Sequence, residues 1–257
     1  MVMLASVGLL SACGATTATT YSELLDTSGG TAAVQVVTLD PGTMTASTTT
    51  GSYDYATATL TVGASTITLD AASALSEDQA SAAYSYVSGL DVTNENKVIV
   101  VVTDAADLPS DTTIVYNGQA LVTVTDATAT YEGTMESTIT ANFGITGDTV
   151  TVVLDTITDA TETGATTIAY TATGAEDITI SDLAISGASF STGGSTTAVV
   201  DGFGSAVSTI DTSGATLTAS GLFAGSAADE VAGAATVDAS GAALNAGTAL
   251  ITFTGTQ

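Results

Sequence analysis

Apolar and polar residues alternate with a period of two along much of the chain. Residues 59–62 (TLTV) and 66–69 (TITL) place aliphatic side chains on one face and threonines on the other, as expected of half-buried strands. Residues 97–103 (KVIVVVT) form a continuous apolar run instead, which is typical of a strand covered on both faces. The pattern predicts a protein built mainly of strands.

Further strands are predicted in the second half, separated by turn signals such as Gly193-Gly194 and Ser213-Gly214. The predicted segments are residues 120–125, 137–143, 149–155, 177–186, 216–223, 230–238 and 248–254. Seven or eight short strands spaced by turns are typical of a barrel or a sandwich. We therefore predict a mainly β fold, with an antiparallel β-barrel of about eight strands at residues 112–257.

One segment departs from this alternation. Ser76-Glu77-Asp78-Gln79 has the spacing of a capping box with acidic residues in the first turn, and Gly89 is placed to end a helix. The apolar residues that fall on one side of such a helix are Leu75, Ala83, Tyr86 and Leu90. We predict one helix near residues 76–88.

The best candidate for a domain boundary is Leu108-Pro109-Ser110-Asp111. It holds one of only two prolines in the chain, and acidic residues flank it. It would separate a smaller β-rich, handle-like region with the helix, residues 31–108, from the barrel at 112–257. Residues 13–30 include the polar run ATTATT, which is typical of a flexible tether.

The N-terminal residues 1–12 (MVMLASVGLLSA) are apolar but too few to span a bilayer, and small residues near their end are typical of a signal peptide. Leu10-Ser11-Ala12-Cys13 resembles the bacterial lipobox, in which the cysteine becomes the acylated first residue of the mature protein. Cys13 is the only cysteine. We predict lipidation at Cys13 and anchoring in outer-membrane lipid at the cell surface. The alternative is an ordinary secretory signal that contains a cysteine.

Composition narrows the classes of function. The chain has 257 residues, with 27 Asp and Glu against one Lys or Arg, no His, and a net charge of −26. A chain whose only basic residue is Lys97 cannot neutralise a phosphate backbone, which argues against nucleic-acid binding. Histidine and clustered cysteines are the usual residues of triad, acid–base and zinc chemistry. We therefore predict a non-enzyme without cofactors.

Threonine takes the polar side of the alternation. We count 52 Thr and 44 Ala, and Thr is β-branched and suits a half-exposed pleated surface. A transmembrane barrel is the structural alternative, but threonine on one face of most strands and the lack of aromatic girdles argue against it. A soluble barrel tethered by lipid fits the pattern better.

Several short motifs follow one another in the second half. The most specific runs from residue 221 to 233 (GLFAGSAADEVAG) and fits the pattern Phe-x-Gly-x-x-Ala-x-Glu-x-x-Gly. The others are Tyr116-Asn117-Gly118, Tyr131-Glu132-Gly133, Asn142-Phe143-Gly144 and residues 185–190 (ISGASF). Together they resemble the C-terminal barrel of transferrin-binding-protein-like surface lipoproteins, a family that includes the factor-H-binding type.

This resemblance implies an outer-membrane surface lipoprotein that binds a protein or small ligand through barrel loops and performs no chemistry. It does not imply transferrin as the ligand, because the basic residues of that family do not occur in this chain, and it identifies no ligand-binding residue. The alternative is an acidic structural or adhesive module of the envelope, with Ca²⁺ as a possible partner.

Aromatic residues placed before glycines would fill the interior of a barrel. We expect this core role for Tyr116, Tyr131, Phe143, Phe190, Phe223 and Phe253. Asp229 and Glu230 are expected to cap a turn or face solvent, and Lys97 to cap the edge of its strand or pair with Glu95.

Two acidic clusters are candidates for a Ca²⁺ site. The first consists of Asp104, Asp107 and Asp111, and the second of Asp155, Asp159 and Glu162. Calcium takes six to eight oxygen ligands, and neither cluster has the register of an EF-hand loop. We predict no metal site.

Overall fold

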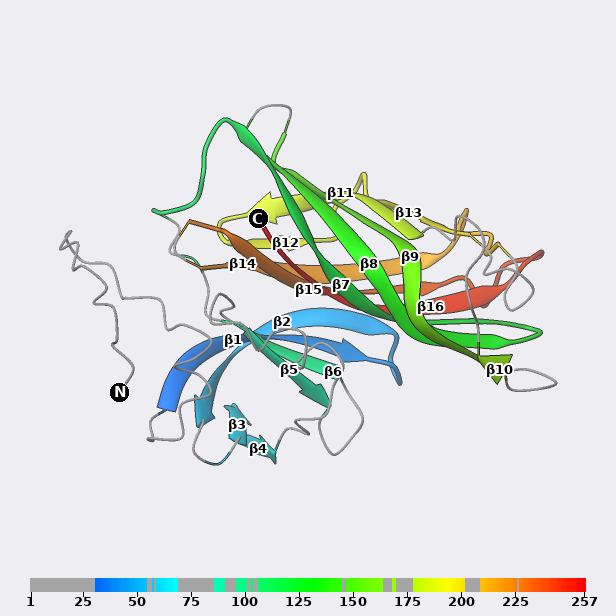
Figure 1. Cartoon of the computed structure of the whole chain (residues 1–257), viewed down its shortest axis with the longest axis horizontal. Coiled ribbons are helices and arrows are strands. Elements are labelled where there is room, and N and C mark those ends of the chain that lie inside the picture. Colours follow the sequence, from blue (N-terminus) through cyan, green and yellow to red (C-terminus); the bar gives the residue numbers. More distant parts are fainter. Residues whose placement is uncertain are drawn as a thin grey trace, which may run out of the picture.

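The computed structural model describes residues 31–54, 57, 59–68, 86–90, 96–100, 103, 106–144, 147–163, 168–169, 178–201, 209–225 and 227–257. Within them, strands β1–β6 form a first sheet, called sheet A, in the order β4-β3-β2-β1-β6-β5 (Figure 1). The bounds are β1 Thr31–Asp40, β2 Thr45–Asp54, β3 Thr59–Val62, β4 Ser65–Thr68, β5 Tyr86–Leu90 and β6 Asn96–Val100.

Ten strands form the second sheet. Their bounds are β7 Thr112–Asp126, β8 Thr130–Phe143, β9 Thr149–Thr163, β10 Ile168–Ala169, β11 Ile178–Ser186, β12 Ser189–Ser191, β13 Thr197–Val200, β14 Thr216–Ala224, β15 Glu230–Asp238 and β16 Gly247–Thr256. Their order is β10-β9-β8-β7-β16-β15-β14-β12-β11-β13, and β9 also pairs with β11. That last pairing closes eight of the strands into a barrel, and all the pairings are antiparallel. The predicted mainly β fold with an antiparallel barrel of about eight strands is confirmed.

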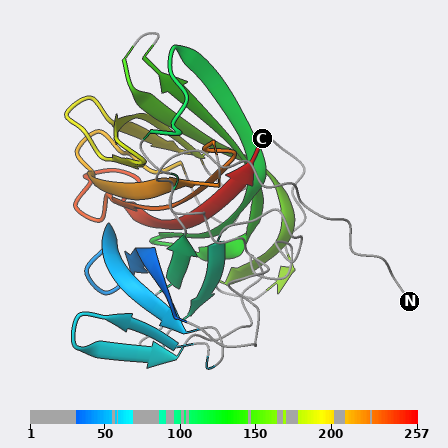
Figure 2. The same cartoon turned by 90° about the vertical axis from the view of Figure 1, so that its left-hand side faces the viewer.

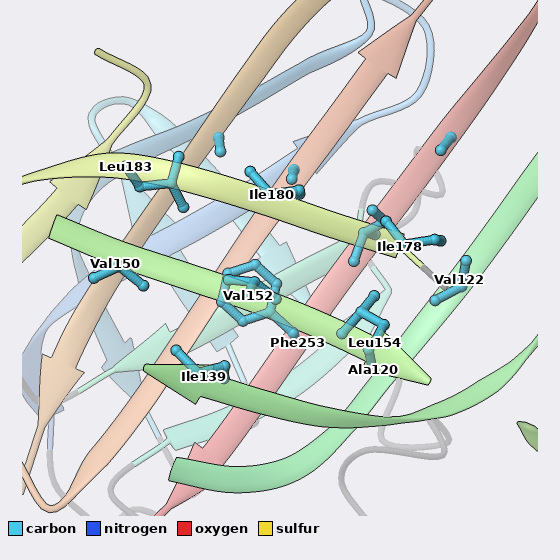
Figure 3. Close-up of a cluster of buried hydrophobic side chains, with 14 of the residues drawn as sticks. Ala120, Val122, Ile139, Val150, Val152, Leu154, Ile178, Ile180, Leu183 and Phe253 are labelled. Atoms are coloured by element: carbon cyan, nitrogen blue, oxygen red, sulfur yellow. The ribbon is translucent and has the colours of Figure 1, made fainter. Parts of the chain in front are cut away.

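Aliphatic side chains line the inner face of the barrel at the seam where β9 meets β11. Val152 lies opposite Ile180 and Val150 opposite Leu183 in the register of these strands, and all four side chains are fully buried. Figure 3 shows them pointing into the same cluster as Phe253 from the far wall. This packing is the consequence of the period-two pattern, because alternate residues of a strand share one face.

Two phenylalanines and two glycines form a row across four neighbouring strands. Phe190 lies opposite Gly221, Gly221 opposite Gly233, and Gly233 opposite Phe253. A Cβ on Gly221 would lie 2.0 Å from the Phe190 ring, and one on Gly233 would lie 2.4 Å from the Phe253 ring. The two rings stack with their centroids 6.2 Å apart. The glycines therefore provide the space in which the rings pack.

The six aromatic residues expected in the core are all buried, which confirms that prediction. Their exposed fractions are 0% for Tyr116, 0% for Tyr131, 4% for Phe143, 1% for Phe190, 0% for Phe223 and 0% for Phe253. Phe223 lies at the centre, with ring centroids 5.0 Å from Phe143, 5.5 Å from Phe190 and 6.2 Å from Tyr116. The barrel interior is a packed aromatic core.

Sheet A packs on the outside of the barrel, over β14 and β15 (Figure 2). Val37 and Leu39 of β1 cluster there with small outward side chains such as Ala232 and Ala234. Strand β15 is therefore buried on both faces, because its alternate residues, such as Ala235, belong to the barrel core. Alanine on the outer face lets the two sheets approach closely.

Hydroxyl groups join the two sheets beside this apolar contact. The Ala46 amide donates to Thr218 Oγ1 at 2.9 Å, and Thr236 Oγ1 donates to the Met44 carbonyl at 2.8 Å. Thr218 and Thr236 also bond to each other at 2.7 Å. These threonines satisfy polar groups at the start of β2 and in the turn before it, which docking on the barrel removes from water.

The predicted helix near residues 76–88 is wrong over its last turn. Tyr86–Leu90 is strand β5, and each of its residues pairs with β6, including Gly89 opposite Lys97. Gly89 therefore lies inside a strand and does not cap a helix. Residues 71–85 lie outside the described part of the chain. Pairing along β6 satisfies the hydrogen bonds of this segment's backbone, and that outweighs a local capping signal.

Among the described residues, no helix is long and apolar enough to cross a membrane.

Candidate ligand-binding groove

The residues that the sequence singled out for chemistry are only partly described. Cys13 lies outside the described residues, so its lipidation stays a prediction. Asp107 and Asp111 are exposed, while Asp104 lies outside the described part. Asp155 is exposed on β9, and the Asp159 and Glu162 side chains lie outside the described part of the structure. The described residues contain no group of three or more His, Cys, Asp or Glu arranged to hold a metal ion.

The expected partnership of Lys97 also lies outside what is described. Strand β6 contains Lys97, but the structure describes only its backbone, and Glu95 is not among the described residues. The pairing of these two residues stays a prediction.

The turn between β14 and β15, inside the most specific sequence motif, has an unusual backbone. Gly225 has a φ of +85° and Ala228 a φ of +54°, both in the left-handed region. A Cβ on Gly225 would collide with the Asp229 carboxylate, at 1.6 Å from Oδ1. Only glycine can adopt this conformation so close to the carboxylate, which explains why the motif has a glycine at position 225.

Tyr116, on the far strand β7, reaches this turn. Its hydroxyl donates to the Ala228 carbonyl at 2.6 Å, and the side chain is fully buried. Burial, and to a lesser degree the Asp229 carboxylate, raises the pKa of the Tyr116 hydroxyl well above its usual value. The phenol therefore stays neutral and holds the turn as a hydrogen-bond donor.

Two other segments are tied to the same turn. The Thr103 amide donates to the Phe223 carbonyl at 3.0 Å, and its hydroxyl donates to the Gly225 carbonyl at 2.9 Å. The C-terminal Gln257 amide donates to the Asp229 carbonyl at 3.0 Å. The turn within residues 221–233 therefore has a structural role, because it joins Thr103, Tyr116 of β7 and Gln257 through hydrogen bonds.

The expectation for the acidic pair in this motif was half right. Asp229 is exposed, as expected. Glu230 is only 2% exposed, so the expectation that it faces solvent is wrong, and its role as a cap of the turn stays a prediction. Glu230 is the first residue of β15 and has the parity of Ala232 and Ala234, so its side chain projects from the outer face of that strand.

An open groove of about 460 Å³ lies between sheet A and the barrel. One wall comes from β1 and β2, and the other from β12, β14 and the turn before β12. The polar residues that line it are Gln35, Thr48, Ser189, Ser191 and Ser220. Phe190, Leu222 and Ala188 supply its apolar surface. None of these eight lining residues is charged.

Hydrogen bonds hold several of these polar groups in place. Thr48 and Ser220 bond to each other through their hydroxyls across the junction of the two sheets. Gln35 Nε2 donates to Thr50 Oγ1 at 3.0 Å, and Ser189 Oγ donates to the Ser186 carbonyl at 2.8 Å. A hydroxyl that donates once still has lone pairs with which to accept. The groove therefore presents an ordered set of neutral donors and acceptors.

Sequence reasoning did not find this groove. Its two walls come from segments more than 130 residues apart in the sequence. Thr48, for example, contacts Ser220, which lies 172 positions further along the chain. Each serine and threonine looks like any other in a chain so rich in both. The only local signal is Ser189-Phe190-Ser191, where two small polar residues flank a buried ring.

A second, smaller hollow of about 220 Å³ lies at one end of the barrel. Asp111 and Asp148 both approach Gly144 there, and Asp148 Oδ1 accepts from the Gly144 amide at 2.7 Å. Asp111 has a φ of +51°. The Asp148 carboxylate stabilises the β8–β9 turn. The larger groove is the stronger candidate for binding.

Comparison with known proteins gives similarity at the level of structure alone. No model of a known protein family matches the chain, and no curated protein matches it. Among solved structures, it is similar to a double mutant of transferrin binding protein B from Haemophilus parasuis Hp5, with 16% identity and a TM-score of 0.44 over 67% of this chain and 32% of that one.

Two further solved structures are similar. One is isotype 1 transferrin binding protein B from serogroup B Neisseria meningitidis, with 16% identity and a TM-score of 0.43 over 66% of this chain and 30% of that one. The other is described as a surface lipoprotein, with 14% identity and a TM-score of 0.35 over 73% of this chain and 80% of that one. The chain spans about a third of the two transferrin binding protein B chains.

Proposed function

We propose that this chain is a non-catalytic lipoprotein of the bacterial outer membrane, exposed at the cell surface, that binds a ligand on the outside of its barrel. The observation that carries the proposal is the open groove of about 460 Å³ between sheet A and β12–β14. Ligand sites are concave and largely formed before the ligand arrives, and the hydrogen-bonded walls of this groove meet that description.

The filled barrel supports binding outside it. Phe190, Phe223 and Phe253 occupy the interior with stacked and tilted rings, so the barrel acts as a rigid platform. Phe190 links the two regions, because it packs into this core and also forms part of the groove wall. A rigid support lowers the entropy lost when a ligand binds.

The anchor is proposed from the N-terminal motif. Leu10-Ser11-Ala12-Cys13 would give a mature protein that begins with acylated Cys13, and each buried methylene of an acyl chain adds about 0.8 kcal/mol of membrane affinity. The first strand in the described part of the chain begins at Thr31, so the predicted tether would separate the lipid from that strand.

Protease treatment of intact cells tests the surface location. The full-length chain is produced in a Gram-negative host, and intact and lysed cells are treated with proteinase K before immunodetection. We expect cleavage on intact cells. A chain that is protected until lysis would overturn the surface location and favour an envelope role inside the outer membrane.

A Cys13→Ala variant serves as the matched control for the anchor. It keeps the signal segment but removes the only thiol that can be acylated. We expect the wild-type chain in the membrane pellet and the variant in the released fraction. Retention of the variant in the pellet would show that the chain is not held by lipid at this residue.

A further inference from the structure

We infer that the groove between sheet A and the barrel binds a neutral, polyhydroxylated ligand, that is, an uncharged carbohydrate of mono- to trisaccharide size. The inference rests on the proposed binding function and names the chemical class that this groove would take. It is drawn from Gln35, Thr48, Ser189, Ser191 and Ser220, which line the groove together with the buried Phe190 and Leu222.

The polar groups of the groove match sugar hydroxyls. A serine or threonine hydroxyl has one donor and two acceptor lone pairs, and a glutamine amide has two donors and an acceptor. A sugar hydroxyl also donates and accepts. The four hydroxyls and one amide of the groove can therefore pair with the hydroxyls of a sugar so that each donor faces an acceptor. A ligand without hydroxyls would leave these groups without hydrogen-bond partners, which costs binding free energy.

Charge excludes the other small ligands. An anion would meet no basic side chain among the eight described residues that line the groove. A metal cation or an amine would find no carboxylate among the eight lining residues. The eight described lining residues carry no charge, and this favours a neutral ligand.

Apolar ligands fit less well. Phe190 and Leu222 are only 1% and 3% exposed, because the Phe190 ring packs inside the barrel and Leu222 packs under sheet A. The groove therefore offers mainly hydroxyl and amide groups to a ligand. The volume of about 460 Å³ lies in the range of roughly 300–1,000 Å³ found for small-molecule sites.

Saturation-transfer NMR on the purified full-length chain tests the inference. The probes are maltotriose, cellotriose and triacetylchitotriose, with tri-galacturonic acid as the charged comparator. We expect a saturable signal from at least one neutral trisaccharide and none from the acidic one. No signal from any neutral trisaccharide, or an equal signal from the acidic one, would overturn the inference.

Variants locate the binding. Gln35→Leu keeps the size of the side chain but removes the amide, and Ser191→Ala removes an exposed hydroxyl on β12. Each is expected to raise the Kd at least fivefold. Thr138→Val makes a similar change at an exposed position of β8 away from the groove, and it is expected to leave the Kd unchanged. Equal Kd values in all three variants would show that the sugar binds elsewhere.

The two proposals fail separately. Cleavage on intact cells without trisaccharide binding would overturn the ligand class and leave the surface location standing. Trisaccharide binding by a chain that is protected until lysis would overturn the surface location and leave the ligand class standing.

Discussion

Small residues decide the packing of this barrel. Most cores are filled by adding large side chains, but Gly221 and Gly233 contribute by leaving space, into which the Phe190 and Phe253 rings fold. Pairing an aromatic residue with a glycine on the neighbouring strand covers the exposed glycine backbone with the ring. Close-packed interiors respond to the volume of a single methyl group, so these positions are the most sensitive to substitution.

Gly221→Ala is expected to destabilise the chain by about 1–3 kcal/mol, the usual cost of overpacking a core. The new Cβ would lie 2.0 Å from Phe190 Cζ, and the ring has to move. Urea denaturation measures the change in the free energy of unfolding. Gly241→Ala is the control, because a Cβ there meets nothing within 4 Å. Adding Phe190→Leu to the Gly221→Ala variant is expected to recover part of the loss, and equal stability of the two glycine variants would contradict this account.

At the scale of the strands and their turns, carboxylates and hydroxyls set the connections. Asp126 accepts from the Thr128 amide at 2.7 Å and from its hydroxyl at 2.6 Å, before β8 starts. Asp211 accepts from Ser213, and hydrogen bonds from the Ser213 side chain and backbone lower the pKa of Asp211. Asp-x-Ser and Asp-x-Thr sequences thus form Asx turns, which gives part of the large negative charge a structural use.

The β14–β15 turn yields a prediction for alkaline pH. The pKa of Tyr116 is raised on folding, so its contribution to stability is present below about pH 10, the usual pKa of a tyrosine, and is lost as the pH rises above it. Tyr116→Phe is expected to cost about 1–2 kcal/mol at pH 8 by removing the hydrogen bond to Ala228.

Above pH 10 the stability difference between wild type and Tyr116→Phe should narrow, because the unfolded wild-type chain then gains stability by ionising. Thermal unfolding of both chains from pH 8 to pH 11 measures it. A difference that stays constant over this range would show that the Tyr116 hydroxyl ionises equally in the folded and unfolded chain.

The sequence predicts the bounds of β14 and β15 closely. The predicted bounds of β15, 230–238, agree with the structure, and those of β14 differ by one residue at its end. Strand β2 (TASTTTGSYD) was not singled out, because it has too few apolar residues to show a period. It is a strand since all ten of its residues pair with β1. Strand β5 was mistaken for part of a helix for the same reason, namely that its neighbour decides its conformation.

At the scale of the whole molecule, the position of sheet A on the barrel defines the candidate site. The outer face of β14 and β15 is built from Leu222, Ala224, Ala232 and Ala234, and sheet A covers it with Val37 and Leu39. Where this apolar contact ends, the groove begins, at Gln35 and Thr48. The groove therefore exists only while the two sheets are docked.

Ala234→Leu is expected to loosen sheet A without unfolding the barrel. The longer side chain projects from β15 into the cluster with Val37, at an overpacking cost of about 1–3 kcal/mol. Hydrogen exchange should speed up in β1 and β2 and remain slow in β7–β9. Ala243→Leu, at an exposed position, is the control. Equal protection of β1 in wild type and Ala234→Leu would contradict the close packing described here.

Strand content, turn positions and the aromatic core could all be derived from the linear order of residues, because each depends on a period of two or on local turn chemistry. The docking of sheet A, the burial of Glu230 and the neutral groove could not. Each arises where segments far apart in the chain meet, as Thr48 meets Ser220 and Tyr116 meets Ala228. Period and turn chemistry act within a few residues, whereas burial and binding surfaces depend on which distant strands the folded chain places side by side.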